Sequence, residues 1–190
     1  MVMRRAVPDT VSGGIAIESR AESERSAAFR GLAERHLDDS YALANAILGN
    51  PSEAEDAVHD AVITGWRKWA SLRDPARFEA WFRRIVVNTC RDHVRRNKRR
   101  VTTDIETAAG LAAPDDTHAV HVRIQVEQSL AQLKPDDRIV LALRYYRDLK
   151  IDDIAAALDI PSGTATSRLR TAHLRLEKIL SQTQPQEGVR

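Results

Sequence analysis

A run of hydrogen-bonding side chains near the end of the chain has residue types and a spacing that suit binding to DNA. The run follows Pro161, which ends one helical pattern, and Ser162, which can cap the next helix. Arginine can bond guanine at two points, and serine or threonine can bond bases or phosphates. The candidate residues are Thr164, Thr166, Ser167, Arg168, Arg170, Arg175 and Lys178. The last two suit contacts to phosphate groups.

Two helical patterns position these side chains. The apolar residues at helical spacing are Ile151, Ile154, Ala155 and Leu158 before Pro161, and Leu169, Leu176 and Ile179 after it. This arrangement predicts a helix-turn-helix, whose second helix enters a DNA groove. An ordinary helical hairpin with a solvated basic face fits this segment about equally well. The rest of the chain must therefore decide between the two.

Positive charge is concentrated in one segment, although the whole chain carries a net charge of only +2. Residues 83–100 contain eight Arg or Lys side chains against one acid, Asp92, which leaves a local charge of +7. Such a concentration favours a polyanion as partner. The composition, 43% hydrophobic and 29% charged, is that of a globular protein, and no apolar run is long enough to span a bilayer. We therefore expect no membrane insertion.

No group of residues has the spacing of an enzyme active site or a metal site. Cys90 has only His93 at helical spacing, and a buried thiol is its simplest interpretation. The six histidines never form a repeated ligand pattern, and no glycine-rich loop follows a strand. We expect no catalytic residue, no metal and no cofactor. Because Met1 to Ala6 lacks the apolar core of a signal peptide, we also expect a cytoplasmic protein.

The residues that begin, end and interrupt the helical patterns predict an all-α protein with two small helical domains joined by a flexible linker. The expected parts are a disordered tail at 1–25, a helical domain at 26–100, a linker at 101–118, a second helical domain at 119–182 and a tail at 183–190. Ser52 and Glu55 are predicted to form a capping box. Asp74 with Pro75 should begin a further helix, and so should Pro135.

Three stretches resemble one protein family. Residues 56–69 and 78–92 are similar to region 2 of the extracytoplasmic-function (group IV) sigma factors of bacterial RNA polymerase, and residues 160–169 resemble the region 4 helix-turn-helix of the same family. Matching stretches at 29–100 and 130–180 cover 123 of the 190 residues. The resemblance implies a protein that binds core RNA polymerase, directs it to a promoter with −35 and −10 elements, and assists promoter opening. RNA synthesis itself would belong to the polymerase.

The resemblance also implies roles for particular residues. The positions that match the family's polymerase-docking surface, which binds the β′ clamp coiled coil, are Asp56, His59, Asp60 and Ile63. Spacings of three and four place the two carboxylates and the histidine on one helix face. From the residues alone, a solvated acidic face near a helix amino terminus would be the simpler interpretation.

A second set of positions matches the family's −10 surface, and the helix-turn-helix side chains named above would read the −35 element. The −10 set is Leu72, Arg73, Arg84, Asn88, Arg91 and Arg95. The implied partners are core RNA polymerase, through its β′ clamp coiled coil and β flap, and promoter DNA. The resemblance leaves room for an anti-sigma factor as a further partner.

Two other classes of function remain open from the sequence. A helix-turn-helix repressor or activator would use the same motif without binding core polymerase. A helical adaptor that binds only protein would leave the +7 segment without a role. Promoter-specific transcripts from core polymerase would separate the sigma factor from both alternatives.

Overall fold

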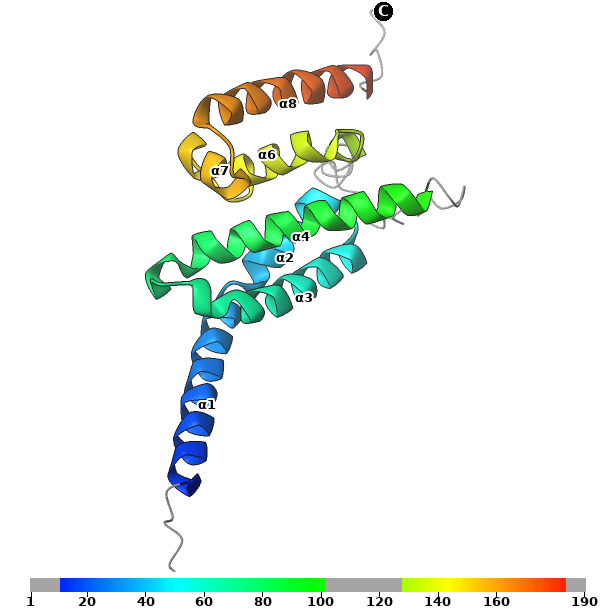
Figure 1. The fold of residues 1–190 in the computed structure, drawn as a ribbon. Helices are drawn as coiled ribbons and strands as arrows, with labels where there is room; N and C mark the ends of the chain where they lie inside the picture. Colours follow the sequence, from blue (N-terminus) through cyan, green and yellow to red (C-terminus); the bar gives the residue numbers. More distant parts are fainter. Residues whose placement is uncertain (1–10, 102–127, 184–190) are drawn as a thin grey trace, which may run out of the picture. The chain divides into compact units, whose positions relative to one another are not determined.

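The computed structural model describes residues 11–101 and 128–183, and within these ranges all regular structure is helical. The elements are α1 (Val11–Arg35), α2 (Leu37–Leu48), α3 (Pro51–Lys68), the 3₁₀ turns η1 (Trp69–Ser71) and η2 (Pro75–Arg77), α4 (Phe78–Val101), α6 (Pro135–Tyr145), α7 (Ile151–Leu158) and α8 (Ser162–Thr183) (Figure 1). The predicted all-α class is confirmed. Most of the predicted linker and the ends of both predicted tails lie outside the described residues.

The chain divides into two compact units, residues 1–36 and residues 37–190. Helix α1 belongs to the first unit and begins at Val11. The disordered tail expected at 1–25 thus overlaps helix α1 from Val11 onward. The segment lacks a sustained apolar period, but its Ala, Glu and Arg residues have high intrinsic helix propensity, which requires no such period.

The connection between α2 and α3 corrects the predicted capping box. Gly49 follows α2 with a φ of 69°, a left-handed conformation that glycine adopts without a steric penalty. Asn50 then caps α3, because its side chain accepts a hydrogen bond from the Glu53 N–H at 3.1 Å. Pro51 occupies the first helical position, where its fixed φ suits the helix. The helix thus begins before Ser52, which leaves no free N–H for the predicted cap at that residue.

Helices α2, α3 and α4 pack together as the first bundle. The predicted start at Asp74 and Pro75 is confirmed, since Asp74 accepts a hydrogen bond from the Ala76 N–H at 3.0 Å and η2 leads into α4. Phe78 and Phe82 of α4 are buried in this bundle. Cys90 is fully buried as well, and burial raises the pKa of its thiol to about 12. The thiol is therefore protonated at neutral pH and unreactive.

Helices α6, α7 and α8 form the second bundle, with Ile139, Val140 and Leu143 of α6 buried as predicted. Helix α6 packs on α2, and α7 packs on α4 (Figure 1). The two bundles, which the sequence indicated as domains on a flexible linker, thus contact each other within one compact unit.

Candidate nucleic-acid interface

The turn of the helix-turn-helix is formed by backbone bonds at residues 159–161. Asp159 adopts the left-handed conformation (φ 57°), its N–H bonds to the Ala156 carbonyl at 3.4 Å, and the Ile160 N–H bonds to the Ala155 carbonyl at 3.1 Å. This pair of bonds is the Schellman motif, which ends an α-helix. The turn predicted here is confirmed, but Asp159 rather than Pro161 ends the first helix.

The role predicted for Ser162 also changes. Ser162 is the first residue of α8, and its hydroxyl donates a hydrogen bond to the Asp152 carboxylate at 2.7 Å. The N–H groups of Thr164 and Ala165 instead bond to the Pro161 carbonyl. Ser162 therefore joins the two helices of the motif, α7 and α8, rather than capping the second.

Helix α8 has one buried side, occupied by Ala165 and Ala172, and one open side. The predicted DNA-contacting residues Thr166, Ser167, Arg170, Arg175 and Lys178 are exposed, while Thr164 and Arg168 are half-buried. Two of the hydroxyls donate to backbone carbonyls of their own helix, which leaves their oxygen atoms as acceptors: Thr166 to Ser162 and Ser167 to Thr164, both at 3.0 Å.

Arg175 differs from its neighbours on α8 because it has a buried partner. Its guanidinium donates to the carboxylate of Asp137 in α6, whose side chain is only 8% exposed. A buried carboxylate requires such a partner. The phosphate contact predicted for Arg175 thus competes with a bond that joins α6 to α8.

The predicted docking residues lie on the outer side of α3. Asp56, His59 and Ile63 are exposed, and Asp60 is half-buried. Sequence reasoning missed the partners of Asp60: its carboxylate bonds to Nε2 of His93 at 2.9 Å and accepts from Arg96 at 3.2 Å.

These bonds hold the Asp60 carboxylate against α4. The bond from His93 lowers the pKa of Asp60 most, burial opposes it, and Arg96 lowers the pKa further. The only signal in the sequence was that His93 and Arg96 are three residues apart on a predicted helix.

A groove of about 610 Å³ between α3 and α4 is lined by residues that include Asp60, Ile63 and Arg95. Residues from the predicted docking and −10 sets therefore share one groove.

The predicted −10 residues lie in two places. Half-buried Leu72 and exposed Arg73 belong to the connection between η1 and η2. The others are on α4, where Arg84, Asn88 and Arg95 are exposed and Arg91 is half-buried.

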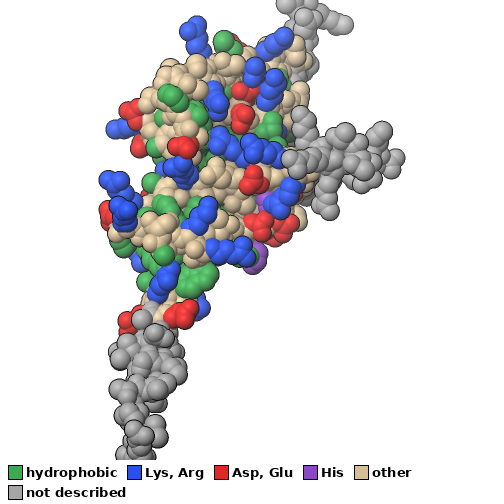
Figure 2. All heavy atoms as spheres, viewed as in Figure 1, with side chains coloured by type: hydrophobic (Ala, Val, Ile, Leu, Met, Phe, Trp, Pro, Cys, Tyr) green, Lys and Arg blue, Asp and Glu red, His purple; other side chains and the backbone are tan. Residues whose placement is uncertain are grey.

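The +7 segment does not form a uniformly basic surface. Its ion pairs include Arg83 with Glu79, Arg84 with Asp159, Arg91 with Asp136, Arg95 with Asp92, and Arg96 with Asp60. On the face drawn in Figure 2, Asp and Glu side chains lie among the Lys and Arg side chains of both bundles. Two of these acids, Asp136 and Asp159, come from the second bundle, so the charge of α4 is balanced partly by helices distant in the sequence.

Within the described residues, no group of three or more His, Cys, Asp or Glu side chains is arranged to hold a metal ion. None of the helices searched in those ranges has the length and apolar character needed to cross a membrane.

Comparison with known proteins agrees with the two-bundle fold. Residues 32–100 match the family model for sigma-70 region 2, and residues 123–176 match that for sigma-70, region 4. The ECF RNA polymerase sigma factor SigM of Mycobacterium tuberculosis is 33% identical over 153 residues, which cover 80% of this chain and 77% of SigM. SigW of Bacillus subtilis, another ECF RNA polymerase sigma factor, is 27% identical over 166 residues, covering 80% and 89%.

The fold is shared with solved structures, among them RpoE and CnrH. The sigma factor RpoE, solved with the anti-sigma factor NepR from Bartonella quintana, has a TM-score of 0.65 and 24% identity over 82% of this chain and 98% of RpoE. CnrH, solved with the cytosolic domain of CnrY, has a TM-score of 0.62 and 24% identity over 87% of this chain and 96% of CnrH.

The helix-turn-helix together with the region 2 bundle defines a transcription initiation protein of the sigma-70 type. Within that class, the chain belongs to the ECF sigma factors, the subunits that bind RNA polymerase and direct the initiation of transcription at promoters. Membership of this family favours a sigma factor over the two alternatives that the sequence left open, a repressor or activator and a protein-binding adaptor. Neither of those needs a region 2 domain.

Proposed function

We propose that the outer side of α3 docks on the β′ clamp coiled coil of the polymerase. The observation that carries this assignment is the division of α3 into two sides. Ala54, Ala57, Val58 and Ala61 are buried in the first bundle. Asp56, His59 and Ile63 lie on the side left to solvent. A carboxylate beside an exposed aliphatic residue suits a basic helical partner with an apolar strip.

The −10 element would be held by α4 and by the connection before it. Asn88 is exposed on α4 and offers both a donor and an acceptor to an unpaired base. Arg73, Arg84, Arg91 and Arg95 supply positive charge for the backbone of a single strand, and Leu72 an apolar surface for a base.

The −35 element would be read by the open side of α8 in the major groove. Arg168 and Arg170 can bond guanine. Thr166 and Ser167 can accept from base amino groups, and Thr164 can bond a base or a phosphate. Lys178 lies further along the helix, where a phosphate contact fixes orientation rather than sequence. The second bundle would also contact the β flap.

The protein would act in the cytoplasm and leave RNA synthesis to the polymerase. An anti-sigma factor is a further proposed partner, since RpoE, a sigma factor of similar fold, was solved with the anti-sigma factor NepR.

A single charge reversal tests the docking assignment. Asp56→Arg places a cation against the basic partner, and we expect the affinity for core polymerase to fall about 10-fold or more. Glu55→Arg is the matched control, because Glu55 is an exposed acid one residue earlier on α3 and outside the docking set. Pull-down of core enzyme and promoter-dependent transcription measure both variants. Equal binding by Asp56→Arg and Glu55→Arg would contradict the assignment.

A further inference from the structure

The connection between η1 and η2, residues 72–74, carries two of the predicted −10 residues and is held at both ends. At its start, the Leu72 N–H donates to the Trp69 carbonyl at 3.1 Å. At its end, the Asp74 side chain accepts from the Ala76 N–H at 3.0 Å. The place of the connection therefore depends on what holds Trp69 and the start of α4.

The Trp69 ring is held against α4 by an aromatic cluster of Trp69, Phe78, Trp81 and Phe82. It meets Phe78 edge-on, with ring centroids 5.9 Å apart, and Trp81 edge-on at 6.3 Å. Phe78 in turn lies 5.7 Å from Trp81 and stacks on Phe82 at 5.4 Å. Phe78 and Phe82 are each only 1% exposed, so the cluster is rooted in the core of the first bundle. Edge-to-face ring pairs at these distances favour a defined geometry.

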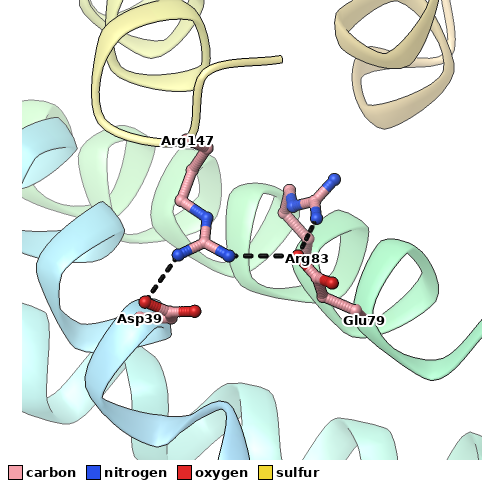
Figure 3. Close-up of polar contacts among 4 residues, drawn as sticks. All are labelled: Asp39, Glu79, Arg83 and Arg147. Carbon is pink, nitrogen blue, oxygen red and sulfur yellow. Dashed lines mark hydrogen bonds and ion pairs between the residues drawn. The ribbon is translucent and has the colours of Figure 1, made fainter.

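The first turn of α4, on which the cluster packs, is fixed by the ion pairs of Glu79. Its carboxylate accepts from Arg83, one turn further along α4, and from Arg147 at 3.0 Å. Arg147 also bonds to Asp39 of α2 at 2.7 Å (Figure 3). Burial alone would raise the pKa of Glu79, but the bonds from Arg83 and Arg147 outweigh burial and lower it. The rings of the cluster thus rest on a helix start that is itself held in place.

Trp69 acts at two points of this segment, because its ring is anchored on α4 while its carbonyl holds the Leu72 N–H. We propose that Trp69 is a positioning residue for the −10 element, which fixes Leu72 and Arg73 in place before DNA binds. The DNA contacts of these two residues rest on the proposed function, whereas the positioning of the connection does not. A segment that is already ordered loses little conformational freedom on binding. Loosening it therefore weakens DNA binding even though every DNA-contacting side chain is kept.

Amide hydrogen exchange of the full chain tests the positioning. We expect Trp69→Leu, which keeps an apolar side chain but no ring, to speed exchange of the Leu72 N–H about 10-fold or more. Trp69→Phe, which restores a ring, should recover most of the protection. Trp81→Leu removes a ring that contacts Trp69 and should act in the same direction. Phe82→Leu is the matched control, because it removes a ring of the cluster that stacks on Phe78 rather than holding η1.

Circular dichroism confirms that each variant is folded. No acceleration at the Leu72 N–H in either Trp69→Leu or Trp81→Leu would overturn the positioning. Equal acceleration in Trp69→Leu and Phe82→Leu would overturn it as well, because the effect would then be a general loss of stability.

Promoter opening by the holoenzyme separates the positioning from the proposed function. Permanganate reactivity of unpaired thymines should show that Trp69→Leu lowers the fraction of open promoter about 5-fold or more, and that Trp69→Phe restores most of it. Affinity for core polymerase and the preference across −35 variants should stay within about 2-fold, because the predicted docking and −35 residues lie on α3 and α8.

A double-mutant cycle with Arg73 completes the test. If Trp69 acts through the connection, Arg73→Ala should lower promoter opening by a smaller factor in the Trp69→Leu background than in the unaltered chain. Independent factors would overturn the action of Trp69 through the connection. If exchange at the Leu72 N–H rises but promoter opening is unchanged, the positioning of the connection stands and its −10 role fails.

Discussion

Helices α8 and α4 both carry arginines assigned to promoter DNA, but they present them differently. On α8, Arg170 lies exposed beside Thr166 and Ser167 on the open side of the helix. On α4, Arg84 and Arg91 are paired with acids of the second bundle. In the free chain, part of the predicted −35 surface is therefore open, whereas two arginines of the predicted −10 surface would have to leave their acidic partners before contacting DNA.

This difference has a structural origin. The −35 surface depends on a local turn and on small residues that let α7 and α8 approach each other, and these features lie within about twenty residues of sequence. The −10 surface depends in addition on how one bundle packs against another. Local features can make a surface, but only long-range packing decides whether it is exposed.

The largest expected effect concerns Arg175, the predicted DNA contact on α8 whose side chain bonds to a buried acid. Arg175→Ala leaves the buried carboxylate of Asp137 without its charged partner, and we expect the free energy of unfolding to fall by about 2–3 kcal/mol. Urea denaturation of the full chain measures the loss. Lys178→Ala, three residues further along α8, should change it by less than about 0.5 kcal/mol. Equal stability of the two variants would mean that the Asp137 bond contributes nothing.

A smaller effect is expected for base recognition. If Arg168 reads a base, Arg168→Ala should weaken binding of the holoenzyme to its preferred −35 sequence by about 1–2 kcal/mol and relax the preference at one position. Lys178→Ala should weaken binding to all DNA sequences alike and reduce the salt dependence of that binding. Affinities across a library of −35 variants measure both. A uniform loss for Arg168→Ala would make Arg168 a phosphate contact.

The smallest effect concerns Asp60, whose pKa is lowered in the folded chain. A lowered carboxyl pKa contributes stability that is present above the pKa of the unfolded chain and is lost as pH falls through the lower, folded value. Because the side chain is 43% exposed, the contribution should be less than about 1 kcal/mol. Urea denaturation should show that Asp60→Asn loses more stability relative to the unaltered chain at pH 6 than at pH 3. A constant difference would assign the effect to shape rather than charge.

The sequence predicts the parts of the fold that depend on neighbouring residues. The helix-turn-helix, the start of a helix at Asp74 and Pro75, and the core residues of α6 are all confirmed. The errors at Ser52 and Ser162 have one cause, because in each case a competing group satisfied the first N–H groups of the helix. A cap is decided by such a competition, which residue types alone do not settle.

The contacts between distant residues could not be predicted in the same way. Nothing near Arg147 in the sequence indicates Asp39 or Glu79, and nothing near Asp60 identifies His93 as its partner. These pairs form because the helices pack in a particular register, and the chain contains many other Arg and acid residues at similar spacing. The docking, −10 and −35 roles of individual residues stay predictions.

The most direct test of the account compares the free chain with the working holoenzyme. Spin labels at Glu55→Cys and Glu177→Cys should give one short, narrow distance in the free chain. After binding to core polymerase and promoter DNA, the distance should become longer, because both α4 and α8 must face the DNA. A holoenzyme that initiates transcription while the distance keeps its value in the free chain would contradict the account.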